Sequence, residues 1–324
     1  MDNMQMNNLI ATQNNNEAIL GKFVYYSLSN VLIDRDKFCD IGRQFGLNKI
    51  KPYRESATDA FRNATGDINK RIVTKSQNGN TKIYRIYFRD NHRVTGDRVS
   101  RELVQETVNR ETNEYTKLAN VYFDKTTETV GYEHVSFSDA VNPYDYINRA
   151  EELFELYKRC YGRRHVDTVV EAMLDEMEAV KISVHGKLYF VPKQHNQLVN
   201  LLEDYIAEVN RYNHNDGEII INSMFVVDDE KQREKMSQEF YINYRKDIET
   251  YQERIQHFLD NGCTSSTIID RWLLKIEALE QKKQTYEDIL KKELHELDDD
   301  FAVLKAQTQD LRLNQLKGQT KLAA

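Results

Sequence analysis

Few side chains in this sequence stand at spacings that support catalysis. Cys160 and His165 lie close together beside Arg163 and Arg164, and basic neighbours can favour a reactive thiolate. Spacing alone does not make a catalytic dyad, and we interpret this segment as a solvated basic turn at a helix break. The sequence also lacks a phosphate-binding glycine loop, a serine-nucleophile motif and a paired-histidine zinc motif. We therefore predict a protein without a catalytic residue.

Two groups of potential metal ligands are interpreted as ordinary surface side chains. His185, His195 and His214 are near one another in the sequence, but a metal site needs further ligands that converge on one point. Asp298–Asp300 form an acidic run, and consecutive residues of a helix point in different directions. We predict no metal site and no cofactor.

The strongest functional signal is a basic region near the N-terminus. Residues 41–110 contain 15 Lys or Arg and 7 Asp or Glu, whereas the whole chain has a net charge of −7. Such an uneven distribution favours contact with a polyanion. We predict that nucleic-acid phosphates are bound by Lys49, Lys51, Arg54, Arg62, Lys70, Arg71, Lys82, Arg85, Arg89 and Arg93.

Aromatic side chains are interleaved with these cations. Tyr53, Phe61, Tyr84, Tyr87 and Phe88 could stack on bases if they are exposed. The competing interpretation is that alternating Arg and Tyr residues are the solvated and buried faces of a sheet. A basic patch is only a first criterion for a nucleic-acid-binding protein, and the sequence leaves both DNA and RNA open.

The helices and strands predicted around these residues indicate an α+β fold. Residues 1–17 are predicted to be a disordered arm and residues 18–135 a basic, β-rich domain. Two short helices, the second capped by Ser56, resemble a helix-turn-helix at the coarsest level. A β-meander follows, in which Asn78-Gly79 is a strong hairpin signal. Its strands are predicted at residues 71–75, 82–88, 102–108, 115–123 and 128–132.

A small mixed α/β domain is predicted for residues 136–228. Its last strand has a near-continuous apolar run, which predicts burial on both faces. The predicted elements are helices at residues 144–161, 166–177 and 194–210 and strands at residues 180–184, 187–191 and 218–227.

Residues 229–324 are predicted to form an antiparallel helical hairpin with coiled-coil character. Apolar residues recur at steps of three and four from Phe240 to Phe258 and, after a break, from Trp272 to Leu311. The step from Leu290 to Leu294 to Leu297 is irregular, which predicts a stutter that would locally unwind a supercoil. Asn261-Gly262 has the chemistry of a turn, and Thr267 with Asp270 fits a capping box at the start of the second helix.

The second of these helices is predicted to be longer than the first, which would leave an overhang without an internal partner. An unfilled apolar seam favours self-association or a partner protein, so we expect a homo-oligomer. The predicted partner-binding residues are Leu297, Phe301, Leu304 and Leu311.

Composition limits the remaining classes of protein. No apolar run approaches the roughly 20 residues that span a bilayer, and the polar N-terminus is unlike a secretory signal. Cys39, Cys160 and Cys263 are far apart and odd in number, which predicts no disulfide framework. A reducing cytoplasm is the simplest expected compartment.

Several segments carry a resemblance to a known family. Gly186–Pro192, followed by an amphipathic helix, an apolar strand ending in Asp228-Asp229 and a long helical tail, resembles an uncharacterised domain family of bacteriophages and other mobile elements. The segments 23–29 and 59–65 are similar to it as well. The resemblance implies a phage or plasmid context and an intracellular, non-enzymatic role.

Three functional hypotheses follow. The first is a nucleic-acid-binding protein with a basic head and a coiled-coil assembly tail. The second is a protein-interaction factor that binds or inhibits a host or defence complex. The third is an unrecognised nuclease or hydrolase.

Overall fold

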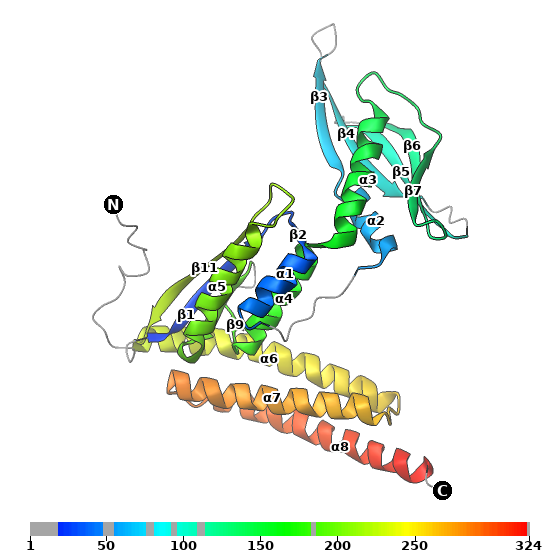
Figure 1. Ribbon diagram of the computed structural model, residues 1–324. Helices are drawn as coiled ribbons and strands as arrows, with labels where there is room; N and C mark the ends of the chain where they lie inside the picture. Colours follow the sequence, from blue (N-terminus) through cyan, green and yellow to red (C-terminus); the bar gives the residue numbers. More distant parts are fainter. Residues whose placement is uncertain are drawn as a thin grey trace, which may run out of the picture. The chain divides into compact units, whose positions relative to one another are not determined.

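The chain forms two compact units, each built from segments that are distant in the sequence. The computed structural model describes residues 19–47, 55–75, 81–91, 96–108, 114–182 and 186–322 (Figure 1). The meander unit comprises the described residues of Leu28–Val169 and Glu208–Glu218, and the helical unit comprises those of Met1–Ser27, Val170–Ala207 and Ile219–Ala324.

These units do not follow the boundaries predicted at residues 135 and 228. The reason is long-range strand pairing: β1 (Ile19–Leu28) pairs with β10 (Leu188–Pro192) in an antiparallel register that includes Phe23 opposite Phe190. The predicted disordered arm, residues 1–17, lies outside the described residues.

The meander unit contains the predicted β-meander. Its five strands pair antiparallel in sequence order, with hairpin neighbours at every step. A register shift between Leu103 and Val104 marks a bulge. The strands are β3 (Asn69–Lys75), β4 (Thr81–Asp90), β5 (Arg98–Thr107), β6 (Glu114–Asp124) and β7 (Thr129–Glu133).

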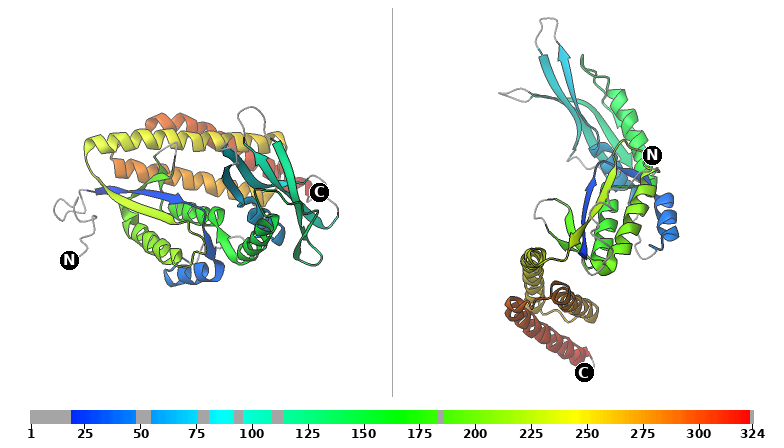
Figure 2. Two further views of the ribbon diagram at one scale, coloured as in Figure 1. Left: turned by 90° about the horizontal axis from the view of Figure 1, so that it is seen from above. Right: turned by 90° about the vertical axis from the view of Figure 1, so that its left-hand side faces the viewer.

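Helices α2 (Ala57–Gly66) and α3 (Pro143–Arg159) cover one face of this sheet (Figure 2). Phe61 on α2 and Phe154 on α3 meet Phe123 of β6 in a buried aromatic cluster with ring centroids 5.3–6.4 Å apart. Ser56 caps α2 as predicted, because its side chain accepts a hydrogen bond from the backbone N–H of Asp59.

The predicted pair of short N-terminal helices is present. Asp34 caps α1 (Arg35–Gln44) by accepting hydrogen bonds from two backbone N–H groups. The start of α1 adjoins a two-stranded ladder of β2 (Leu32–Asp34) and β8 (Cys160–Gly162). Residues 48–54, between α1 and α2, are outside the described residues, so the helix-turn-helix stays a prediction.

The helical unit contains a four-stranded sheet in the order β11-β1-β10-β9. The prediction that its last strand is buried on both faces is wrong: β11 lies at an edge, and Ile220 and Met224 are exposed. The strands are β1 (Ile19–Leu28), β9 (Val180–Lys181), β10 (Leu188–Pro192) and β11 (Ile219–Val227), and the helices α4 (Arg163–Glu176) and α5 (Asn196–Asn210) contribute residues to both units.

Three helices, not two, follow β11. α6 (Glu230–Asp260) and α7 (Ser266–Leu290) are joined at Gly262, which has a φ of +59° as the Asn-Gly turn predicts. The N-cap of α7 is Ser265 and not the predicted Thr267. After α7 a short 3₁₀ turn, His295–Leu297, leads into α8 (Asp298–Leu322).

The predicted continuous second helix ends because Lys291 adopts a left-handed conformation, with a φ of +53°. Non-glycine residues seldom occupy this region. The sequence around Lys291 has no Gly or Pro that would indicate a break in the helix. α8 then packs against both α6 and α7. The coiled-coil geometry of these helices stays a prediction.

The predicted overhang is therefore wrong. The four side chains predicted to bind a partner are buried in the core of the helical unit and offer no surface to a partner in this structure: Leu297, Phe301, Leu304 and Leu311.

Aromatic rings connect the elements of this core. Phe190 of β10 contacts Tyr286 of α7, which stacks on Phe240 of α6 at 4.3 Å between centroids. Phe240 stacks on Tyr244, and Tyr244 on Phe301 of α8. Among the described residues, no helix is both long and apolar enough to cross a membrane.

Candidate functional site

The second face of the meander sheet is not covered by a described helix, and we call it the open face. Because side chains alternate along a strand, the register assigns Arg71 of β3, Arg85 of β4 and Glu106 of β5 to this face as direct cross-strand neighbours. The same alternation adds Tyr87, Arg89, Arg98, Glu102, Val104, Tyr115, Lys117 and Tyr122.

Carboxylates on the open face neutralise part of its positive charge. Glu102 forms ion pairs with Arg89 at 2.8 Å and with Lys117 at 3.1 Å. Partial burial raises the pKa of Glu102, but the hydrogen bonds from Arg89 and Lys117 outweigh it, so the net pKa is lowered. Arg98 pairs in the same way with Asp124 at 3.1 Å.

Arg71 and Arg85 are held differently. They stand directly opposite each other on β3 and β4, and like charges in that position destabilise a sheet. Arg85 donates from Nε to Asn69 Oδ1 at 3.0 Å. Within the described part of the chain neither guanidinium forms an ion pair, although the carboxylate of Glu106 is the cross-strand neighbour of Arg85 on the same face. Two guanidinium groups thus share one neighbouring carboxylate at this end of the open face.

Three arginines of the open face lie over tyrosine rings. The guanidinium carbons of Arg85, Arg89 and Arg98 are 4.7, 6.0 and 4.4 Å from the ring centroids of Tyr87, Tyr115 and Tyr122, respectively. Cation–π contacts of this length hold both planar groups along the sheet surface.

Local packing fixes the positions of two of these rings. A Cβ atom at Gly131 would lie 2.6 Å from Tyr122 Cζ, so only glycine leaves room for the Tyr122 ring. Tyr87 and Lys117 flank Val104 in the register, and Val104 is fully buried. The open face is thus a close-packed layer of long and aromatic side chains.

The structure separates the residues that the sequence grouped as phosphate contacts. Arg71, Arg85 and Arg89 lie on the open face, whereas Arg62 lies on α2 and pairs with Asp59. By the same alternation, the side chains of Lys70 and Lys82 belong to the helix-covered face of the sheet. Four predicted residues lie outside the described residues: Lys49, Lys51, Arg54 and Arg93.

The predicted set omitted Arg98, Lys117, Tyr115 and Tyr122, which the register places on the open face. Alternation within the predicted strand at residues 115–123 was the available signal for Tyr115, Lys117 and Tyr122, whereas Arg98 precedes the predicted strand at residues 102–108 and β5 begins earlier than predicted. The predicted aromatic partners Phe61 and Phe88 are instead buried in the core.

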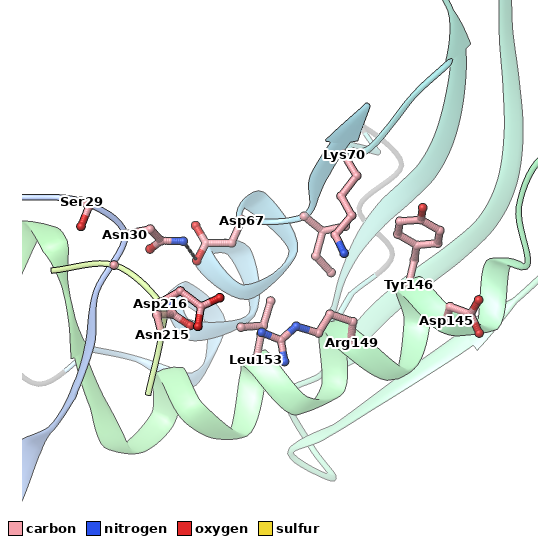
Figure 3. Close-up of a pocket in the computed structure, with 12 residues that line it drawn as sticks. Ser29, Asn30, Asp67, Lys70, Asp145, Tyr146, Arg149, Leu153, Asn215 and Asp216 are labelled. Carbon is pink, nitrogen blue, oxygen red and sulfur yellow. Dashed lines mark hydrogen bonds between the residues drawn. The ribbon is translucent and has the colours of Figure 1, made fainter. Parts of the chain in front are cut away.

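Lys70 lines a cavity of about 650 Å³ beside α3 (Figure 3). Arg149 of α3 and the carboxylates of Asp67 and Asp216 line the same cavity. Asp67 Oδ2 accepts hydrogen bonds from Asn30 Nδ2 at 3.1 Å and from Tyr157 Oη at 2.6 Å. Asp67 therefore holds three segments of the meander unit together, which is a structural role.

The segment around Cys160 lacks the features of an activated thiol. Cys160 is buried, and burial raises the pKa of its thiol to about 11. Burial and the nearby Arg35 and Arg164 lower the pKa of His165. Both groups favour their neutral forms. The helix break is present, but the prediction of a solvated turn is wrong for Cys160–Gly162, which form the buried strand β8 paired with β2. Among the described residues no group of three His, Cys, Asp or Glu is placed to hold a metal ion.

Comparison with known proteins gives a family for most of the chain. Residues 19–319 match a family described as "Family of unknown function (DUF6744)". The chain belongs to this family. No curated protein and no solved structure matches it. Membership of an uncharacterised domain family is thereby confirmed, whereas the phage or mobile-element context, which the family description does not mention, stays a prediction.

Proposed function

We propose that the meander unit binds single-stranded nucleic acid through the open face of its sheet. The observation that carries the proposal is the directly opposed pair Arg71 and Arg85, which share a face with the three arginine–tyrosine contacts. We call these two residues the arginine pair.

The arginine pair supplies the phosphate contact in this proposal. Two cations held side by side repel each other, and an anion between them relieves that repulsion. Guanidinium groups present planar arrays of donors that match phosphate oxygens. A bound phosphate would therefore add an ion pair where the described residues of the free protein form none.

The tyrosines supply the contact with bases. Tyr115 is 54% exposed and lies on the same face as Tyr87 and Tyr122. Unstacked bases bind to aromatic and guanidinium planes on open sheets, and this mode tolerates any base sequence. In a duplex the bases are already stacked on each other, so an open face of this kind favours a single strand.

The cations of the open face that already form ion pairs with carboxylates can also bind phosphate, because ion pairs at the surface are weak. An ion pair at the protein surface contributes about 0–1 kcal/mol. Arg89 is 47% exposed beside Glu102, so it can exchange a carboxylate for a phosphate at little cost.

Fluorescence anisotropy of the full-length protein with labelled oligo(dT) and oligo(U) tests the proposal. Arg71→Ser/Arg85→Ser is expected to weaken binding at least about tenfold, since hydrogen bonds to charged groups contribute about 1.5–3 kcal/mol each. Losing two phosphate contacts should also lower the slope of log K against log salt by about 1.4.

The matched control is Arg43→Ser/Arg211→Ser. Both arginines belong to the meander unit, lie off the open face and are 68% and 73% exposed. The control should bind like the wild type. The proposal fails if neither oligonucleotide binds at low salt, or if the two double variants lose equal affinity; protein capture from the host would then favour the interaction-factor hypothesis.

A further inference from the structure

The helical unit contains a buried lysine without a carboxylate partner. Lys22 of β1 is 4% exposed. Its Nζ donates to Asn200 Oδ1 at 2.5 Å and to Ser223 Oγ at 3.1 Å, and it lies 4.9 Å from the ring centroid of Phe225. Within the described residues Lys22 forms no ion pair. Lysine side chains are seldom buried unless they are paired, so this position requires an explanation.

A cavity of about 610 Å³ reaches Lys22. Lys193, Gln194, Gln197 and Asn200 line it and are all exposed, so their side chains form a rim that opens to solvent. Asn196 also lines the cavity, and its Oδ1 is buried without a hydrogen-bond partner. Lys22 therefore lies at a cavity lined mainly by polar side chains.

The surroundings of Lys22 make its amine easier to deprotonate than that of an exposed lysine. Burial lowers the pKa of Lys22, and the more distant charge of Glu203 opposes the effect only in part. Desolvation is one of the ways in which proteins activate lysine as a nucleophile.

We propose that Lys22 is the reactive amine of a carbonyl-binding site, where its Nζ condenses with the aldehyde or ketone of a small ligand to form an imine. The nitrogen lone pair attacks the carbonyl carbon, and a proton moves from nitrogen to the former carbonyl oxygen. The resulting hydroxyl then leaves as water with the second proton of the amine, and the C=N bond forms. No electrons are exchanged with another reactant.

The neighbouring residues have positioning roles in this step. Asn200 and Ser223 hold Nζ from two sides. A lysine with a purely structural role would not explain why a cavity open to solvent reaches it.

Reductive trapping tests the proposal on the wild-type protein. The full chain is incubated with glyoxylate and sodium cyanoborohydride, and peptide mass spectrometry follows the modification of each lysine over time. Lys231 and Lys246 are the internal controls, because both are exposed lysines of the helical unit. We expect Lys22 to react faster than both controls, because a lowered pKa raises the fraction of neutral amine. Modification of the two controls ahead of Lys22 would overturn the proposal.

A second measurement uses Lys22→Arg, which keeps the charge but has no primary amine. Without reductant, glyoxylate should raise the Tm of the wild type and leave that of Lys22→Arg unchanged. An equal shift in both proteins would show that the aldehyde binds elsewhere. If Lys22→Arg does not fold, the order of lysine modification in the wild type still decides the question.

Discussion

The two units hold their cations in opposite ways. On the open face of the meander unit, Arg89 and Arg98 are each 47% exposed and each pairs with a carboxylate. In the helical unit, Lys22 is buried and its hydrogen-bond partners are neutral. The first arrangement can exchange one anion for another at the surface, whereas the second selects what can enter a cavity.

Aromatic side chains show the same contrast. Tyr115 on the open face is 54% exposed, whereas Tyr286 of the helical unit is 1% exposed in a stack of rings. Aromatic burial stabilises the fold, and aromatic exposure provides contact area for a ligand. We therefore expect substitutions in the helical core to act mainly on stability and substitutions on the open face to act mainly on binding.

The largest expected effect is that of Phe301→Ala on the helical unit. Phe301 is 5% exposed and stacks on Tyr244, and truncating a buried Phe costs about 3–5 kcal/mol. Urea denaturation followed by the fluorescence of Trp272, the single tryptophan of the chain, measures the loss in this unit.

Val303→Ala is the matched control on the same helix, because Val303 is 53% exposed. It should change stability by less than about 0.5 kcal/mol. Equal effects of the two substitutions would mean that α8 is not packed against α6 and α7, and the unpartnered overhang predicted from the sequence would regain support.

Most helices and strands were predicted correctly, because they depend on residues that are close together in the sequence. Alternation and the Asn78-Gly79 turn indicated the meander, and Ser56 caps α2 as its sequence predicts. The break after α7 was missed because Lys291 carries no turn signal. The irregular spacing of Leu290, Leu294 and Leu297 was its only trace in the sequence.

Pairing between distant segments could not be predicted from local patterns. β1 and β10 form one sheet although most of the meander unit lies between them in the chain. The pairing of β3 with β4 is local and was predicted, but the register that sets Arg71 opposite Arg85 depends on the turn type and loop length, which the Asn78-Gly79 signal does not define alone. Lys22 carried no signal at all, since its burial depends on Asn200 and Ser223 far along the chain.

An intermediate effect is expected for two of the buried tyrosines, one from each unit. Tyr157 of the meander unit donates to the Asp67 carboxylate at 2.6 Å, and Tyr286 of the helical unit donates to the Glu178 carbonyl at 2.8 Å. Tyr157→Phe should cost about 1.5–3 kcal/mol and Tyr286→Phe about 0.5–1.5 kcal/mol, because hydrogen bonds to charged groups are stronger. Urea denaturation followed by circular dichroism compares them, and the reverse order would show that burial outweighs charge here.

The smallest effect is expected for Glu102→Gln on the open face. The pKa of Glu102 is lowered in the folded protein, so its ion pairs stabilise the fold above the ordinary carboxyl pKa. That contribution disappears as the pH falls through the lowered value. The wild type should exceed Glu102→Gln by up to about 1 kcal/mol at neutral pH, and the difference should vanish in acid, as measured by urea denaturation at both pH values.

Glu155→Gln is the matched control, because it removes the carboxylate of an exposed ion pair away from the open face. Glu155 pairs with Lys158 on α3 and is 66% exposed, so its substitution should leave stability nearly unchanged at both pH values. A cost for Glu102→Gln far above 1 kcal/mol would mean that Glu102 holds Arg89 and Lys117 too tightly for a phosphate to displace it. A cost within the expected range leaves both cations free to change partners, which nucleic-acid binding on the open face requires.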